Sequence, residues 1–246
     1  MLLKEQFEKS GKWLFRWRSY LPIFIIVLIL VAMRHYEYLG NSKLLETIWV
    51  VFCFLVSFIG LGIRIITIGH VPRGTSGRNR RKQVADSLNT TGIYSIVRNP
   101  LYLGNFFMGL GISLFAHIWW VVLIYILVFW LYYERIICAE EEFLIKKFGD
   151  EYLNWADSTP AFFPNFKGYI KSDLSFSIRN VLKREYHGFF ALIVVMFCLK
   201  IASDLYVKGK PEFDLGWIIL MSISFMIWIV LRILNKHTRI LDVRGR

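Results

Sequence analysis

The chain has 246 residues, of which 56% are hydrophobic and 17% aromatic, and its formal net charge is +12. A mean hydropathy of +0.47 argues against an ordinary soluble domain, because the apolar residues are gathered in long runs. The basic residues lie between these runs, which indicates loops that face anionic lipid and argues against a nucleic-acid-binding protein.

Long apolar runs predict an all-α, polytopic membrane protein with about six transmembrane helices. The runs cover residues 20–38, 48–68, 101–116, 118–133, 189–207 and 215–231. Only His117 separates the third run from the fourth, so we expect a tight helical hairpin there. The first run follows a basic tail without a small-x-small cleavage site, and we expect it to be a retained span.

The distribution of Lys and Arg along the chain predicts its orientation. The N-terminal tail carries five, residues 70–99 carry six, residues 135–187 carry eight, and residues 232–246 carry five. The loops between them carry only Arg34 with Lys43, and Lys208 with Lys210. The positive-inside rule therefore predicts an integral protein of the inner (cytoplasmic) membrane with both termini in the cytoplasm.

Three regions follow from this pattern. Residues 1–69 would hold the first two spans, residues 70–170 the chemical core with the hairpin, and residues 171–246 the last two spans. The hairpin would return its two flanking segments to the same side, where they would form a cytoplasmic cap. A helix is expected to continue out of the fourth run until Gly149 bends it, and Pro160 and Pro164 end regular helix.

The first polar cluster precedes the hairpin, at residues 91–102. Pro100 suits the first turn of the following helix, and Asn99 falls at its N-cap. Such a helix N-terminus favours a carboxylate ligand. The alternative is that the tyrosines and Arg98 only anchor a helix at the membrane interface.

The second polar cluster follows the hairpin, at residues 134–142. Glu140 and Glu141 come directly after a membrane helix, where carboxylates are costly unless they are paired or solvated. They could bind a sulfonium, a ribose hydroxyl or an amine, or pair with arginine. The alternative is a solvated helix segment with ordinary charge pairs. The scattered cysteines and histidines predict neither a disulfide nor a metal site.

Together the two clusters resemble the isoprenylcysteine carboxyl methyltransferases and their relatives, the phospholipid methyltransferases. That family has Gly-x-Tyr, Arg-His-Pro-x-Tyr, a helical hairpin, Glu-Glu and Phe-Gly-x-x-Tyr. The matching residues are Gly92-Ile93-Tyr94, Arg98-Asn99-Pro100-Leu101-Tyr102, Glu140-Glu141 and Phe148-Gly149-Asp150-Glu151-Tyr152. The match covers residues 86–164, about a third of the chain. Asn99 replaces the family's histidine; its amide can donate a hydrogen bond but carries no charge.

The resemblance implies a cytoplasmic pocket for S-adenosylmethionine. By position, the cofactor would be bound by Asp86, Ser87, Leu88, Asn89, Tyr94, Asn99, Pro100, Leu101, Tyr102 and Glu140. Arg98 and Arg135 would bind the substrate, and Arg135 and Glu141 would be catalytic. The family's substrate-facing arginine falls at Ile136, so Arg135 is displaced by about 100° around the helix. Methyl transfer is an in-line displacement that relies on positioning and needs no metal.

The expected acceptor is a lipid in the bilayer. The basic loop from Arg73 to Lys82 suits an anionic headgroup, so the leading expectation is O-methylation of a lipid phosphate such as that of lipid A, as in similar bacterial proteins. Prenylcysteine carboxyl methylation and phospholipid N-methylation are the alternatives within the family. Outside it, a non-catalytic membrane scaffold is possible, and a related membrane fold serves NADPH-dependent sterol reductases.

Overall fold

A computed structural model describes residues 3–18, 20–72, 74, 85–243 and 245. Its α-helices are α1 (Leu3–Trp17), α2 (Leu21–Ala32), α3 (Lys43–Gly69), α4 (Pro100–Leu114), α5 (Trp119–Phe148), α6 (Asp150–Ser158), α7 (Ile178–Lys208) and α8 (Leu215–His237). Short 3-10 helices cover Met33–His35, Leu39–Asn41, Ile93–Ser95 and Phe166–Gly168. Over these described residues the only β-type pairing is an isolated bridge between Gly92 and Ile170, which confirms the all-α class.

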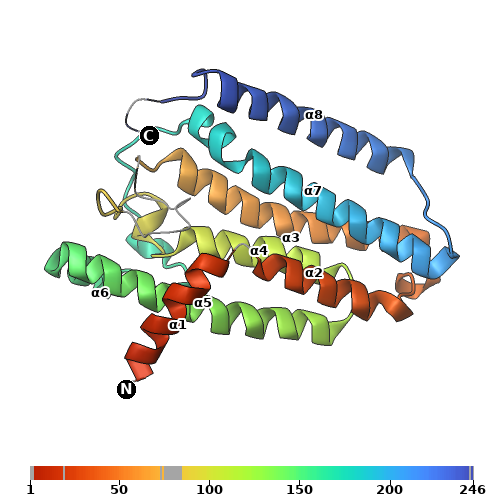
Figure 1. The fold of residues 1–246 in the computed structure, drawn as a ribbon, viewed down its shortest axis with the longest axis horizontal. Coiled ribbons are helices and arrows are strands. Elements are labelled where there is room, and N and C mark those ends of the chain that lie inside the picture. The colour runs from red at the N-terminus through yellow and green to blue at the C-terminus, as the bar shows by residue number, and fades with distance from the viewer. Residues whose placement is uncertain (1–2, 19, 73, 75–84, 244, 246) are drawn as a thin grey trace.

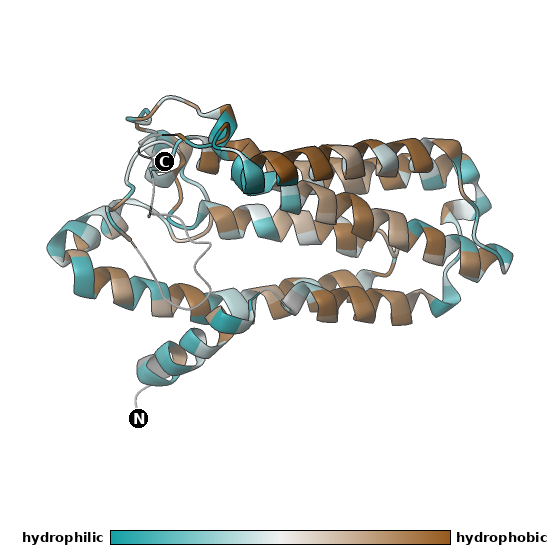
Figure 2. Ribbon diagram, turned by 45° about the horizontal axis from the view of Figure 1, so that its top comes forward, coloured by the Kyte–Doolittle hydropathy of each residue, from teal (hydrophilic) through white to brown (hydrophobic). Residues whose placement is uncertain are grey.

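The long helices form a bundle whose members run side by side along the long axis of the molecule (Figure 1). Both chain termini lie at one end of this bundle, together with α1 and α6. Hydrophobic residues fill the middle of the bundle, and hydrophilic residues gather at its two ends (Figure 2). A polypeptide with an apolar belt between two polar ends matches a bilayer with water on both sides.

Four helices, α3, α5, α7 and α8, are long and apolar enough to cross a membrane. Helices α1 and α2 are bent by 75° relative to each other and make a fifth crossing if they are taken as one span. Every predicted apolar run contains a helix, but α2 has only 12 residues and α4 only 15. Both fall below the roughly 20 residues that a full crossing needs. Over the described residues, length and composition thus support a polytopic membrane protein with four to five spans, where about six were expected.

The predicted hairpin is formed by α4 and α5. Its turn contains His117 in a left-handed conformation, with φ of 58°, between Leu114 and Trp119. Helix α5 then runs for 30 residues, about 45 Å, and so extends beyond its apolar part. Gly149, with φ of 55°, ends it and starts α6. The tight turn, the extended helix and the break at Gly149 are all confirmed.

Helices α3 and α4 approach closely because glycines lie at their contact. A methyl group added at Gly60 would lie 2.3 Å from the carbonyl oxygen of Gly104, and one at Gly111 would lie 2.1 Å from Ser57 Oγ. Small residues permit such backbone approach between membrane helices. The glycines of α4 therefore serve helix packing, and this packing brings Asn105 of α4 against Arg64 of α3.

The variant Gly60→Ala is expected to lower the thermal unfolding midpoint in detergent, because the added methyl overpacks the α3–α4 contact at a cost of about 1–3 kcal/mol. Gly62→Ala is the matched control, since an added methyl there meets no atom within 4 Å. In a helix interior, alanine at that position should even stabilise by up to about 1 kcal/mol. Equal midpoints for the two variants would contradict the close packing at Gly60.

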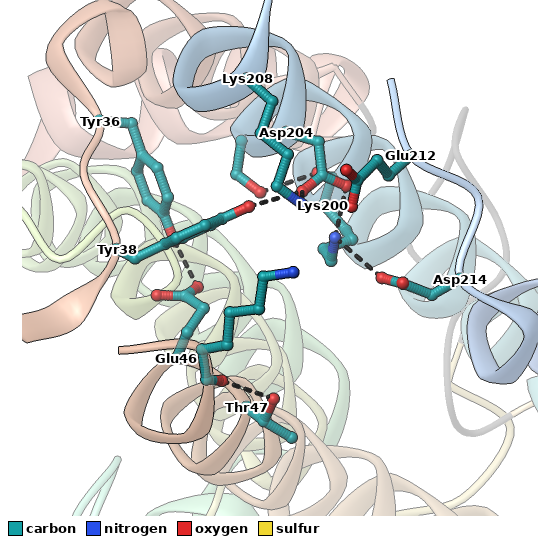
Figure 3. Close-up of polar contacts among 11 residues, drawn as sticks. Tyr36, Tyr38, Glu46, Thr47, Lys200, Asp204, Lys208, Glu212 and Asp214 are labelled. Atoms are coloured by element: carbon teal, nitrogen blue, oxygen red, sulfur yellow. Dashed lines mark hydrogen bonds and ion pairs between the residues drawn. The ribbon is translucent and has the colours of Figure 1, made fainter. Parts of the chain in front are cut away.

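At the bundle end opposite the termini, an ion-pair cluster joins the α7–α8 turn to the segment between α2 and α3 (Figure 3). The fully buried Asp204 carboxylate accepts a hydrogen bond of 2.8 Å from Tyr38 and pairs with Lys200 and Lys208. Lys200 also contacts Asp214 at 3.1 Å. The two polar clusters of the sequence, at residues 91–102 and 134–142, lie at the other end of the bundle. We therefore interpret this ion-pair cluster as a contact that stabilises the packing of the helices.

Candidate active site

The two polar segments that flank the hairpin lie against each other at the end of the bundle that holds the termini. Backbone hydrogen bonds join Arg98 N to Pro160 O at 2.9 Å, Asn165 N to Ile96 O at 2.9 Å, and Gly92 N to Ile170 O at 2.8 Å. Gly92 has φ of 63°, a conformation that favours glycine, where the chain turns into the Ile93–Ser95 helix. The expectation that the hairpin returns both segments to one side is confirmed.

Glu140, on α5, contacts side chains of α4 and of the segment between α1 and α2. The hydroxyl of Tyr102 on α4 donates a hydrogen bond of 2.8 Å to Glu140 Oε1. The ring of Tyr102 packs on that of Tyr133 with 4.7 Å between centroids, and both tyrosines are less than 10% exposed. Arg18 Nη1 lies 4.0 Å from the same carboxylate oxygen. The Glu140 carboxylate is thus held between the rings of two buried tyrosines and the guanidinium of Arg18.

Glu141 points to a different partner because it lies about 100° further around α5. Arg98 Nη2 is 3.3 Å from Glu141 Oε1. Among the described residues, the buried Arg98 Nε has no hydrogen-bond partner, and the buried Glu141 Oε1 has only this ion pair. Burial, and then the nearby Glu141 carboxylate, raise the pKa of Tyr152, which keeps this phenol neutral. Buried polar atoms without partners are uncommon and are a reason to expect a ligand here.

A polar pocket of about 150 Å³ adjoins this region. Four residues predicted to bind the cofactor line it: Ser87, Leu88, Asn89 and Tyr94. The indole of Trp155 donates a hydrogen bond of 3.2 Å to the carbonyl of Tyr94 and so ties α6 to this wall. Burial raises the pKa of Tyr94, and the charges of Arg184 and Glu140 shift it in opposite directions. Tyr94 therefore lies in the polar pocket, within reach of the charge on Glu140.

An ion pair between the half-buried Arg64 and the buried Glu185 supports the site from the side of α3. Arg64 donates from Nε and Nη2 to the two carboxylate oxygens of Glu185, each at 2.7 Å. Its Nη1 donates to Asn105 Oδ1 at 2.7 Å, and Asn105 donates in turn to the hydroxyl of Tyr133 at 3.3 Å. Arg64 was visible in the sequence as the only charge in its apolar run. Its partner was missed, because Glu185 lies far away in the chain.

Four predicted cofactor residues, Asp86, Asn99, Pro100 and Leu101, have other surroundings. Asn99 occupies the N-cap of α4 and Pro100 its first turn, as expected, but the Asn99 side chain does not cap the helix. Its side-chain amide donates a hydrogen bond of 3.0 Å to the carbonyl of Ala161 instead. This hydrogen bond joins the segment before the hairpin to the segment after it. Asp86 is exposed and bonds through its backbone to Gly74. Neither Asp86 nor Leu101 lines the polar pocket.

Arg135 faces away from Glu140. Its guanidinium lies over the ring of Phe7 on α1, with 5.3 Å to the ring centroid, while Ile136 beside it is fully buried. The basic loop also expected to bind substrate lies outside the described residues, except for Gly74. The structure therefore brings together Arg98, Glu141, Tyr102 and Glu140, and it does not bring Arg135 to them.

A second cavity, of about 270 Å³, lies between α2, α4, α5 and α7. Most of its wall is apolar, with Ile25, Met108, Phe129 and Leu192 among the lining residues. Its polar lining residues are Arg18, Asn105, Tyr125 and Tyr133. The Tyr125 hydroxyl donates a hydrogen bond of 2.8 Å to the carbonyl of Phe106, whereas Arg18, Asn105 and Tyr133 lie on the side of Glu140 in their segments. The apolar cavity thus ends beside the polar site.

Comparison with known proteins agrees with the motifs. The family model described as phospholipid methyltransferase matches residues 51–151. The protein-S-isoprenylcysteine O-methyltransferase of Schizosaccharomyces pombe is 35% identical over 77 residues, which are 31% of this chain and 33% of that protein. The cobalt-zinc-cadmium resistance protein CzcN of Cupriavidus metallidurans is 34% identical over 111 residues, 44% of this chain and 49% of that protein.

A longer alignment joins the chain to the nickel-cobalt-cadmium resistance protein NccN of Alcaligenes xylosoxydans xylosoxydans, with 31% identity over 150 residues, 60% of this chain and 62% of that protein. The aligned part thus spans between a third and three fifths of the length of these relatives. No solved structure matches the chain. Tyr94, Arg98, Tyr102, Glu140 and Glu141 all lie within the matched region, whereas Arg18 and Glu185 lie outside it.

Proposed function

We propose that the chain is a member of the family of phospholipid and isoprenylcysteine methyltransferases and that it transfers a methyl group from S-adenosylmethionine to a lipid substrate at the cytoplasmic face of the membrane. The observation that carries this proposal is the junction of a polar site around Glu140 with an apolar cavity between the helices. The charged donor would enter the site from water, and the lipid acceptor would enter it from the bilayer. The basic residues at the end that holds both termini favour a cytoplasmic position for the site.

The residues present fit S-adenosylmethionine. The polar pocket beside Tyr94 suits the nucleoside, and the Glu140 carboxylate suits either the ribose hydroxyls or the positive sulfonium. The buried Arg98 Nε, which has no partner among the described residues, suits the carboxylate of the cofactor. When bound, the cofactor would supply an electrophilic methyl group. No group of described His, Cys, Asp and Glu side chains could hold a metal ion.

The protein's part in such a reaction is to position the acceptor and exclude water. The apolar cavity would hold the lipid chain, and its polar end at Asn105 and Tyr133 would hold the acceptor oxygen near Glu140. Fixed orientation of two reactants can supply much of the acceleration of a displacement reaction. We propose a lipid phosphate, such as that of lipid A, as the first acceptor to test. A prenylcysteine carboxylate, which the names of several relatives indicate, is the second.

The proposal is tested with purified protein in lipid nanodiscs. Calorimetric titration should detect binding of S-adenosylmethionine but not of NADPH. A donor with a labelled methyl group, incubated with bacterial membrane lipids, should then yield a labelled lipid that mass spectrometry identifies. A non-catalytic scaffold would yield no labelled lipid, and binding of NADPH alone would favour a reductase.

The variant Ala191→Trp should separate donor binding from acceptor binding. Ala191 lines the apolar cavity on α7, so a large side chain there would occupy the space of the lipid chain. We expect the affinity for S-adenosylmethionine to be unchanged and the rate with the lipid acceptor to fall by at least about tenfold, equivalent to roughly 1.4 kcal/mol. Leu205→Trp, on the exposed surface of the same helix, is the control and should keep full activity. An active Ala191→Trp enzyme would place the lipid elsewhere.

A further inference from the structure

We propose that Arg18, at the elbow between α1 and α2, binds the headgroup of the acceptor and thereby selects anionic acceptors over uncharged ones. This inference rests on the proposed function, since it concerns the lipid that the apolar cavity would hold. Arg18 lies outside the region that matches the family model, and so the resemblance gives it no role. Its place in the structure is what indicates one.

Arg18 lies at the boundary between the two compartments of the site. Within the part of the chain that the structure describes, it is the only charged residue that lines the apolar cavity. Its Nη1 atom is also 4.0 Å from Glu140 Oε1, in the polar site. The side chain is only 16% exposed, and the guanidinium lies over the buried ring of Phe15, 4.0 Å from its centroid. An anionic group held by this guanidinium would therefore lie next to Glu140.

Arg64, Arg98 and Arg135, three other arginines near the site, are placed differently. Arg64 makes three hydrogen bonds of 2.7 Å, two of them to Glu185. Arg98 pairs with Glu141, and Arg135 lies over Phe7, so neither lines the cavity. The planar guanidinium binds carboxylates and phosphates through paired hydrogen bonds, and such a contact is strengthened where water is excluded. Arg18 thus combines the suitable chemistry with access to the lipid chain's cavity.

Helix α1 positions Arg18 by docking on α5. Gly11 lies so close to α5 that an added methyl group would be 2.0 Å from the carbonyl oxygen of Arg135. One turn further along, the hydroxyl of Tyr132 on α5 donates a hydrogen bond of 2.7 Å to the carbonyl of Leu14. These contacts hold α1 against the cytoplasmic part of α5, directly before the bend that places Arg18 beside Glu140. Arg135 serves this docking through its backbone and through its stacking on Phe7.

The first experiment measures binding without turnover. Tryptophan fluorescence titrations of the protein in nanodiscs with dodecyl phosphate, dodecanoate and dodecanol give the affinity for two anionic probes and one uncharged probe. We expect Arg18→Gln to weaken binding of the anionic probes by roughly tenfold or more and to leave dodecanol binding unchanged. Arg16→Gln, two residues away on an exposed position, is the matched control and should change none of them. A larger loss for phosphate than for carboxylate would indicate a lipid phosphate as the acceptor.

The second variant, Gly11→Leu, keeps the charge of Arg18 but displaces α1. It should reproduce the selective loss of anionic binding, while a circular dichroism spectrum like that of the wild type verifies folding. The inference is overturned if Arg18→Gln retains its affinity for dodecyl phosphate and dodecanoate, or if it loses all three probes equally. Failure of the wild type to bind S-adenosylmethionine would instead overturn the proposed function, because these titrations contain no methyl donor.

Discussion

Replacement of Arg64 by methionine is expected to lower the free energy of unfolding by about 3–5 kcal/mol, because it leaves a buried carboxylate without its counter-ion. Glu185 is only 4% exposed, and both of its oxygens accept hydrogen bonds from Arg64. Asn105 would lose a donor as well. Reversible unfolding in mixed micelles of mild detergent and dodecyl sulfate measures this change.

The double variant Arg64→Met with Glu185→Leu is the control for this interpretation. If the penalty comes from an unpaired buried charge, removal of the second charge should restore most of the stability, since apolar side chains of similar volume can replace a buried ion pair at little cost. A double variant as unstable as Arg64→Met would show that the loss comes from packing. In that case the ion pair would not be the reason for the stability of the α3–α7 contact.

Replacement of Glu140 by glutamine is expected to weaken binding of S-adenosylmethionine by about 1.5–3 kcal/mol, or roughly 10- to 150-fold in dissociation constant. Glutamine keeps an oxygen that can accept the hydrogen bond from Tyr102, so the packing at this position should persist. What the variant removes is the negative charge that the proposed site presents to the cofactor. Calorimetric titration in nanodiscs measures the affinity.

Glu142→Gln is the matched control, since Glu142 lies on the same helix and faces Lys146, at 4.0 Å. Its cofactor affinity should equal that of the wild type. An unchanged affinity in Glu140→Gln, together with an unchanged melting temperature, would place Glu140 outside the cofactor pocket. Arg98 and Glu141 would then be the polar pair to test next, because Arg98 Nε is buried and has no hydrogen-bond partner among the described residues.

Local sequence signals predicted much of the architecture. Runs of apolar residues determine membrane helices, since a helix satisfies its own backbone in lipid whatever its neighbours are. Pro100 and Gly149 act on the backbone within one turn of the chain, and so the start of α4 and the end of α5 were predictable. Length was less well predicted: α4 ends early at the turn that contains His117, and α2 stops after 12 residues.

The sequence by itself therefore determined the helical class, the hairpin and the presence of Tyr102 and Glu140 in two polar clusters, because these follow from neighbours along the chain. Only the tertiary structure decided which arginine lies at the apolar cavity. Arg135 is close to Glu140 in sequence, but the helix turns its side chain toward α1, whereas the bend between α1 and α2 brings Arg18 to within 4.0 Å of Glu140. The pairing of Arg64 with Glu185, and the cavity itself, likewise depend on how distant helices pack, which no local pattern encodes.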